Sequence, residues 1–356
     1  MVLLPLATVG DEPDAGALAR VSVADAAALL REAGAGELVF VEAPLPLEQA
    51  GEARRLVSPT ERPDASELAT WAERGAAVAG TVQVEDGFVA FELFACAAGG
   101  GEGEARGPVP LAEASVLADA LAQLGADALG LTPADEGPGS ADEDAVRRYV
   151  RGADALLALS AGAAGEPPDV ALAQLLSALE LDAAFVRPRD ALVTAASRAL
   201  DTEAMPLFFG ALSELARLRP DDAIALCALG EYAAFHRDAT RAARLFAQAL
   251  ERDPLAARPR LGLALLAEAR GDVEAALALY ADAERDARDD ARLLARHGAL
   301  LVASGAPAAA VQTLARAAVL DPTDADVRRL LARAYELRGD PDRARAELAA
   351  LAADFD

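Results

Sequence analysis

The sequence predicts a small α/β domain followed by an all-α, right-handed solenoid of helical hairpins. The solenoid is predicted by a pattern that returns every 34 residues from Ala223 to Asp356, so that Gly271, Gly305 and Gly339 lie at equal intervals. A fixed period of this length is typical of stacked helix pairs, in which each pair buries its apolar face against its neighbours. The α/β domain is predicted by strand-like and helix-like segments that alternate through the first 131 residues.

The first half of the α/β domain contains two short strands and two helices. Apolar runs, helical periodicity and Gly or Pro breaks define them. Ser22 is a candidate N-cap for the first helix, and Asp64 or Ser66 for the second. In chain order, the expected elements are a strand over Val2–Leu6, a helix over Val23–Ala33, a strand over Leu38–Val41 and a helix that ends near Arg74.

A β-hairpin and a final helix complete this domain. The β-rich runs Ala76–Val84 and Phe88–Ala95 are separated by Glu85-Asp86-Gly87, and Asp-Gly between two such runs strongly indicates a hairpin turn. We expect Val82 and Val84, with Phe88 and Ala90, to form the alternating pattern of a half-buried sheet. Gly99–Gly103 is expected to be an exit loop, and Leu111–Leu124 a helix.

Composition divides the chain further. Residues 132–145 are rich in Gly, Pro and acids, which is typical of a linker. Within 146–222 we expect two degenerate hairpins, one of which places Ala171, Leu175 and Ala178 in a second helix over Val170–Ala183, before a short insertion at Val186-Arg187-Pro188. Four clear units occupy 223–356. The expected domains are therefore 1–131, 132–145, 146–222 and 223–356.

The repeat has a recognisable pattern. Leu226-x-x-Leu229-Gly230, followed by Ala242, Phe246, Ala249 and Pro254, resembles the tetratricopeptide repeat (TPR). The resemblance implies a superhelix whose concave groove, lined by the first helix of each hairpin, binds a protein or peptide. The side chains it assigns to that groove include one aromatic residue, several apolar residues such as Leu265, and five arginines: Phe235, Arg258, Arg292, Arg296, Arg329 and Arg333.

The N-terminal domain also resembles a known family. Val2-Leu3-Leu4-Pro5-Leu6 followed by Gly10-Asp11-Glu12-Pro13, and Val78–Val82 followed by the hairpin and Ala97-Ala98-Gly99-Gly100, are similar to the TolB-type amino-terminal domain. Bacterial cytoplasmic proteins and regulators often join such a domain to TPRs. The resemblance implies that this domain makes contacts and performs no catalysis.

Charge and composition exclude several classes of partner. The net charge is −25, which repels nucleic acids and anionic membranes. The chain has no Lys and no Asn, so a Schiff base, a phosphate-loop lysine and N-glycosylation are excluded.

Cys96 and Cys227 lie in apolar strings and are expected to be buried free thiols in a reducing compartment. We also see no signal peptide and no membrane-length apolar run. A cytoplasmic protein is therefore expected.

Catalytic and metal-binding patterns are missing from the sequence. His297 stands where sister units carry Leu, so we expect a core histidine, and His236 falls in a turn, where it caps the helix or is solvated. Neither has a Cys or His at ligand spacing. Gly99–Gly103 lacks Lys, and Glu102 and Glu104 would repel a phosphate, so a phosphate cradle is not expected. We therefore expect no enzyme activity, no metal and no cofactor.

Two functional hypotheses follow. In the first, the protein is a scaffold or adaptor whose groove binds an acidic–apolar peptide, because arginine forks suit carboxylates and their stems cover apolar surface. The groove arginines could equally pair with acids of the array itself, such as Glu268 and Glu336. In the second hypothesis, the N-terminal domain binds a small ligand and the array transmits its state, which requires a formed pocket. The sequence leaves the oligomeric state open.

Overall fold

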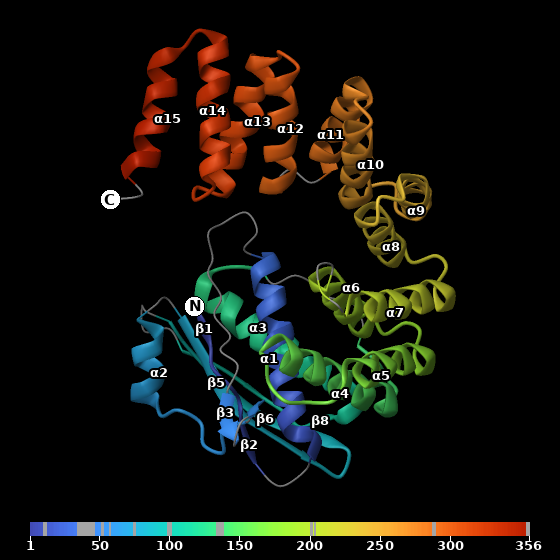
Figure 1. Ribbon diagram of the computed structural model, residues 1–356. Helices are drawn as coiled ribbons and strands as arrows, with labels where there is room; N and C mark the ends of the chain where they lie inside the picture. The colour runs from blue at the N-terminus through green and yellow to red at the C-terminus, as the bar shows by residue number, and fades with distance from the viewer. Residues whose placement is uncertain are drawn as a thin grey trace. The chain divides into compact units, whose positions relative to one another are not determined.

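The computed structural model describes residues 1–9, 13–33, 47–50, 53–56, 58–73, 76–97, 102–132, 139–199, 202, 204–286 and 290–353. The chain forms two compact units, Met1–Arg219 and Pro220–Asp356. An α/β region comes first, and the remaining described residues form helices and their connections (Figure 1). The predicted fold class, an α/β part followed by an array of helical hairpins, is confirmed.

The main sheet of the first unit has the strand order β1-β5-β6-β7, with β2 also paired to β5 and β8 to β6. Both N-terminal strands run parallel to β5, and the others are antiparallel. A separate two-stranded sheet joins β3 to β4. The strands are β1 (Val2–Leu3), β2 (Ala7–Val9), β3 (Leu47–Ala50), β4 (Ala53–Leu56), β5 (Ala76–Glu85), β6 (Phe88–Ala97), β7 (Glu102–Arg106) and β8 (Val109–Pro110).

The strand expected over Val2–Leu6 is confirmed only for Val2 and Leu3, and a second strand, β2, begins at Ala7. Val2 pairs with Ala77, whereas Ala7 pairs with Thr81, so the chain has one extra residue between β1 and β2 relative to β5. Pro5 lies in this bulge, where its missing amide hydrogen removes no ladder bond. The strand expected over Leu38–Val41 lies outside the described residues.

The β5–β6 hairpin is confirmed, but one of its faces was predicted wrongly. Asp86 and Gly87 have φ values of 50° and 78°, the two positive values that a two-residue type I′ turn requires. This turn pairs Glu85 with Phe88, so Phe88 shares the solvent-facing side and is 52% exposed. Ala90 is exposed as well, whereas Val89 and Phe91 are buried. Gly103, expected in a loop, lies in β7.

Helices cover both faces of the sheet (Figure 1). α2 (Ala65–Ala72) packs Leu68 and Ala72 against β1 and β5. α1 (Pro13–Ala33) and α3 (Ser115–Leu129) contact each other, and both also contact β5. Because both faces are covered, the first five residues of β5 are all buried.

The bounds of these helices differ from the expected ones. The first helix begins at Pro13, not after Ser22, because buried apolar residues continue upstream through Leu18 and Ala15; Ser22 is therefore a buried residue within α1 and caps nothing. Of the two candidate caps for α2, Asp64 accepts a hydrogen bond from the Glu67 amide at 2.9 Å. The last helix is preceded by a 3-10 turn over Leu111–Glu113 and ends beyond Leu124, at Leu129.

Four helices complete the first unit: α4 (Glu143–Ser160), α5 (Pro168–Leu181), α6 (Arg187–Arg198) and α7 (Met205–Leu218). The carboxylate of Asp142 caps α4 by accepting from the Ala145 amide at 2.9 Å, so helix begins inside the segment expected as a linker; residues 133–138 of that segment lie outside the described residues. Ala171, Leu175 and Ala178 are fully buried on α5, as expected for a second helix.

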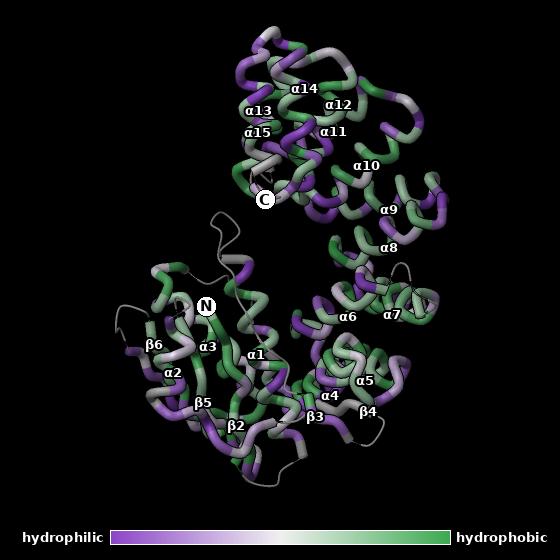
Figure 2. The backbone as a smooth tube through the Cα atoms, turned by 60° about the vertical axis from the view of Figure 1, so that its left-hand side comes forward, coloured by the Kyte–Doolittle hydropathy of each residue, from purple (hydrophilic) through white to green (hydrophobic). Residues whose placement is uncertain are grey.

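The second unit contains eight helices within the described residues, paired as hairpins in chain order. Apolar and polar residues both occur along the array (Figure 2); α9 is strongly amphipathic, whereas α8 is apolar along most of its length. The helices are α8 (Ala223–Phe235), α9 (Ala239–Arg252), α10 (Ala257–Ala269), α11 (Val273–Asp286), α12 (Ala291–Ala303), α13 (Pro307–Leu320), α14 (Ala325–Arg338) and α15 (Pro341–Ala353).

The repeated residues serve equivalent structural roles. Gly271, Gly305 and Gly339 join the helices of a hairpin with φ values of 76°, 78° and 84°, which an L side chain rarely adopts. The repeated alanines and the large residues beyond them are buried in three successive units: Ala242, Ala276, Ala310, Phe246, Tyr280 and Leu314. The fourth large residue, Leu348, is 44% exposed on the last helix of the array.

Candidate functional site

The arginines assigned to the groove of the array fall into two groups. Arg258 is held by Glu231 of the preceding hairpin, with its Nε and one terminal nitrogen each 2.6 Å from a carboxylate oxygen. Arg329 and Arg333 form ion pairs on α14 itself, with Asp326 at 2.5 Å and Glu336 at 2.9 Å. The expected pairing with Glu336 is therefore present, although exposed pairs of this kind contribute little stability.

The other group is Arg292 and Arg296 on α12. Both side chains are exposed, and among the residues the structure describes neither forms an ion pair. Glu268, the acid expected to pair with a groove arginine, instead accepts a hydrogen bond from the Tyr280 hydroxyl at 2.8 Å. Two exposed guanidinium groups, one helical turn apart, therefore lie on α12 with no described acid bound to them.

Apolar side chains accompany these arginines on the first helices of neighbouring hairpins. Phe235 at the end of α8 is 46% exposed, and Leu265 on α10 is 39% exposed. We call the set Phe235, Arg258, Leu265, Arg292, Arg296, Arg329 and Arg333 the first-helix surface. Large exposed apolar groups and arginines are both enriched in protein-binding surfaces.

The predicted core histidine is confirmed. His297 is buried, its ring stacks on Tyr280 at a centroid distance of 5.8 Å, and its Nδ1 lies 2.7 Å from a Glu284 carboxylate oxygen. Arg316 binds the other oxygen of that carboxylate. Because Glu284 receives both partners, the polar histidine is tolerated at a site where sister units carry leucine. His236 is exposed at the end of α8, as expected.

The two cysteines lie in different surroundings. Burial, aided by the Glu231 carboxylate, raises the pKa of Cys227 to about 12, which makes this thiol unreactive at neutral pH. Cys96, expected to be buried, is only partly so, because it lies near the end of β6; both thiols are free. Among the residues described, no group of three His, Cys, Asp or Glu side chains could hold a metal.

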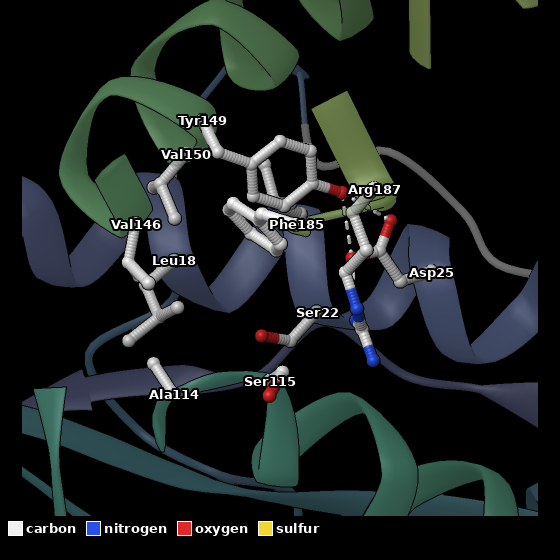
Figure 3. Close-up of a pocket in the computed structure, with 11 residues that line it drawn as sticks. Leu18, Ser22, Asp25, Ala114, Ser115, Val146, Tyr149, Val150, Phe185 and Arg187 are labelled. Carbon is white, nitrogen blue, oxygen red and sulfur yellow. Dashed lines mark hydrogen bonds and ion pairs between the residues drawn. The ribbon is translucent and has the colours of Figure 1, made fainter. Parts of the chain in front are cut away.

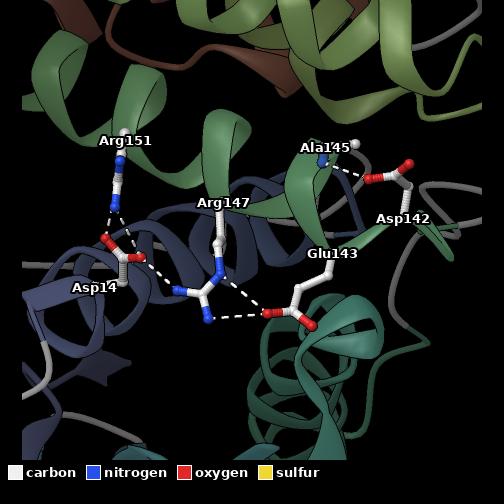
Figure 4. Close-up of polar contacts among 6 residues, drawn as sticks. All are labelled: Asp14, Asp142, Glu143, Ala145, Arg147 and Arg151. Carbon is white, nitrogen blue, oxygen red and sulfur yellow. Dashed lines mark hydrogen bonds and ion pairs between the residues drawn. The ribbon is translucent and has the colours of Figure 1, made fainter. Parts of the chain in front are cut away.

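The first unit contains a polar interface that the sequence did not reveal. Asp14 in the first turn of α1 binds two arginines of α4, Arg147 at 2.7 Å and Arg151 at 3.0 Å (Figure 4). Burial by itself would raise the pKa of the Asp14 carboxyl, but hydrogen bonds from Arg151 and Arg147, and their charges, bring it below its ordinary value. Nearby, Arg20 forms a bidentate pair with Asp154 at 2.7 and 2.8 Å.

A second cluster surrounds Arg187 at the start of α6. One terminal nitrogen lies 2.9 Å from Asp25 of α1, and the Tyr149 hydroxyl donates to Asp25 at 2.8 Å (Figure 3). The other terminal nitrogen lies 2.9 Å from Asp119 of α3. Burial raises the pKa of Asp25, opposed by the charge of Arg187 and the hydrogen bond from Tyr149. The adjacent cavity, about 10 Å³, has room for no more than one water.

A much larger cavity of about 690 Å³ lies among α1, α4, α6 and the start of α7. We call it the α1–α6 cavity. Most of its wall is apolar and rich in alanine, and its polar residues include four arginines and two aspartates. Its lining includes Arg20, Ala24, Asp25, Ala27, Ala28 and Arg31 of α1; Tyr149, Ala153, Leu156 and Leu157 of α4; Arg187, Asp190, Ala191, Thr194, Ala195 and Arg198 of α6; and Phe208 of α7.

Comparison with known proteins supports the assignment of the repeat. The family model for the tetratricopeptide repeat matches residues 301–356. This match covers the end of the array, where the 34-residue pattern was recognised. The comparison with curated proteins finds no significant match.

Several solved structures are similar to part of this chain. PilF of Pseudomonas aeruginosa is 18% identical, with a TM-score of 0.42, and the match covers 46% of this chain and 75% of PilF. MamA of Desulfovibrio magneticus RS-1 is 19% identical, with a TM-score of 0.38, covering 45% and 90%. YrrB, described as a TPR protein with an unusual peptide-binding site, is 16% identical, with a TM-score of 0.38, covering 49% and 89%.

None of the helices in the described residues combines the length and the apolar character that crossing a bilayer demands.

Proposed function

We propose that the protein is a non-enzymatic scaffold or adaptor, and that its first-helix surface binds a peptide or protein partner. The observation that carries the proposal is the pair Arg292 and Arg296, exposed and without a described acid bound to them. In a chain of net charge −25, two neighbouring guanidinium groups with no described acid bound to them form a local attraction for carboxylates.

The chemistry of the surface defines the partner. Phe235 and Leu265 offer exposed apolar area, whereas the arginines offer planar donors for acidic side chains. A segment that alternates or combines Asp or Glu with large apolar residues satisfies both. We therefore propose an acidic–apolar peptide, and neither a nucleic acid nor a membrane, as the ligand.

A peptide-display experiment tests this function. Random peptides are selected on the full-length protein, the enriched ones are labelled, and their affinities are measured by fluorescence anisotropy. We expect enrichment of acidic and apolar residues, and a loss of affinity of about tenfold or more when Arg292→Glu and Arg296→Glu are combined, since each lost charged hydrogen bond is worth about 1.5–3 kcal/mol.

The matched control reverses the same number of charges elsewhere. Arg241 and Arg244 are exposed on α9, the second helix of its hairpin, so Arg241→Glu with Arg244→Glu changes the net charge equally without altering the first-helix surface. Equal effects of the two double variants would reduce the proposal to long-range electrostatics. Enrichment of basic peptides would refute it.

For the N-terminal region we propose a domain of the TolB amino-terminal type, in a bacterial cytoplasmic protein, that supplies a second contact surface. The resemblance of its opening segment and of Val78–Val82 supports this proposal. A second candidate function is ligand sensing by the first unit, which contains a formed cavity of ligand size. Only the α1 side of this cavity belongs to the N-terminal region, where the sensor hypothesis expects the pocket, and the rest of the lining comes from α4, α6, α7 and the chain that leads into α7.

A further inference from the structure

We propose that the α1–α6 cavity binds a small amphipathic organic anion, meaning a carboxylate or a similar acid joined to an apolar body. This inference goes beyond the peptide-binding function, and every residue that carries it belongs to the first unit. The volume of about 690 Å³ falls in the range of about 300–1,000 Å³ that is common for small-molecule sites.

The apolar part of the ligand is specified by the wall. Alanines line the cavity on α1 and α6, and because their side chains end at Cβ they leave the space between the helices open: Ala24, Ala27, Ala28, Ala191 and Ala195. Leu156, Leu157 and Phe208 add larger apolar contacts from α4 and α7. Such a wall can bury a hydrocarbon or aromatic body from water.

The charge of the wall specifies the polar end. The lining contains two arginines for each aspartate, whereas the whole chain has 58 acids and 33 basic residues. The aspartates already have partners, since Asp25 is bound by Arg187 and Tyr149, and Asp190 by Arg189 at 2.7 Å. Both aspartates of the lining therefore already have a cationic partner.

The arginines of the wall have different roles. Arg20 and Arg187 are bound to acids of other helices, so they hold the walls in place. Arg198, in the last turn of α6, is exposed and forms no ion pair within the described part of the chain. Its guanidinium can donate two parallel hydrogen bonds to one carboxylate or sulfonate, and we assign it as the group that receives the ligand's acid.

Two fluorescent probes with nearly the same aromatic body test this site. 1-Anilinonaphthalene-8-sulfonate carries a sulfonate, whereas N-phenyl-1-naphthylamine lacks it. We expect the full-length protein to bind the sulfonate at one site and more tightly than the neutral probe. Arg198→Gln should weaken sulfonate binding by about tenfold and change binding of the neutral probe less than twofold. Arg148→Gln, an exposed arginine of α4 outside the cavity, is the matched control and should change neither.

A second set of variants fills the cavity. Thr194 and Ala28 are exposed residues of its wall, so Thr194→Trp and, as an independent smaller change, Ala28→Leu should exclude both probes while the helical circular dichroism is retained. Arg292→Glu with Arg296→Glu should leave probe binding unchanged, which separates this site from the peptide surface. Equal affinity for the two probes, or unchanged sulfonate binding in both filled variants, would overturn the proposal.

Discussion

Replacement of Arg187 by alanine tests whether buried ion pairs hold the first hairpins to the α/β region. The Arg187 side chain is 4% exposed and bridges Asp25 and Asp119, each at 2.9 Å. Arg187→Ala leaves the largely buried Asp25 carboxylate, whose side chain is 20% exposed, with the Tyr149 hydroxyl as its partner. Removing one partner of a buried pair typically costs about 3–5 kcal/mol, whereas the half-exposed Asp119 adds little. We expect the free energy of unfolding of the first unit to fall by about 3 kcal/mol.

The chain provides its own reporter for this measurement. Its one tryptophan, Trp71, lies in α2 of the first unit, so tryptophan emission in a urea titration reports the unfolding of that unit. With a typical slope of about 1–3 kcal/mol per molar urea, the midpoint should decrease by about 1–3 M. Arg148→Ala, on the exposed side of α4, should shift the free energy by no more than about 0.5 kcal/mol.

A double variant separates the charge from the packing of the arginine stem. Asp25→Asn combined with Arg187→Ala removes the buried charge that the single variant leaves behind, so part of the lost stability should return. The reasoning is refuted if Arg187→Ala and Arg148→Ala have the same midpoint. It is also refuted if the double variant loses the full sum of the two single effects, because the residues would then not interact.

Two further predictions concern one helix packing site and one pH dependence. A Cβ on Gly298 would lie 2.4 Å from Cγ of Leu314, so Gly298→Ala should destabilise the array by about 1–3 kcal/mol. At the control position Gly210 an added Cβ meets nothing within 4 Å, so Gly210→Ala should be neutral or stabilising. Circular dichroism during denaturation measures the stability of both variants. Because the folded-state pKa of Asp14 is lowered, its contribution is present above the unfolded-state pKa of about 3.9 and is lost as the pH falls through the folded-state value. The stability difference between wild type and Asp14→Asn that is present at pH 7 should therefore shrink below about pH 4, as Trp71 emission in urea would measure.

The array was predictable because its contacts are local. Residues such as Ala276 and Tyr280 pack within their own hairpin and the next one, so a 34-residue period in the sequence directly reflects a repeated contact. The β5–β6 turn was predictable for the same reason, since Asp86-Gly87 fixes the geometry of two adjacent strands. The face assigned to Phe88 was wrong because the two-residue turn pairs Phe88 with the exposed Glu85, and paired residues share one face of the sheet.

The first unit was less predictable because the ion pairs that join its helices connect residues far apart in the sequence. Arg187 lies 162 positions from Asp25 and 68 from Asp119, and no local pattern couples residues so far apart. The sequence did mark Val186-Arg187-Pro188 as an insertion that breaks the repeat, and an arginine in such an insertion was the available signal. The α1–α6 cavity was not predictable, since its volume depends on how α1, α4, α6 and α7 pack against one another.

Photo-crosslinking provides the most direct test of the peptide-binding surface. Benzoylphenylalanine is placed at Phe235 or at Leu265, and for comparison at Val319, which is 74% exposed on the second helix α13. A labelled acidic–apolar peptide from the display selection is then irradiated with each protein. The account predicts crosslinks from positions 235 and 265 and none from 319. Crosslinking from 319 alone, or equally from all three, would contradict it.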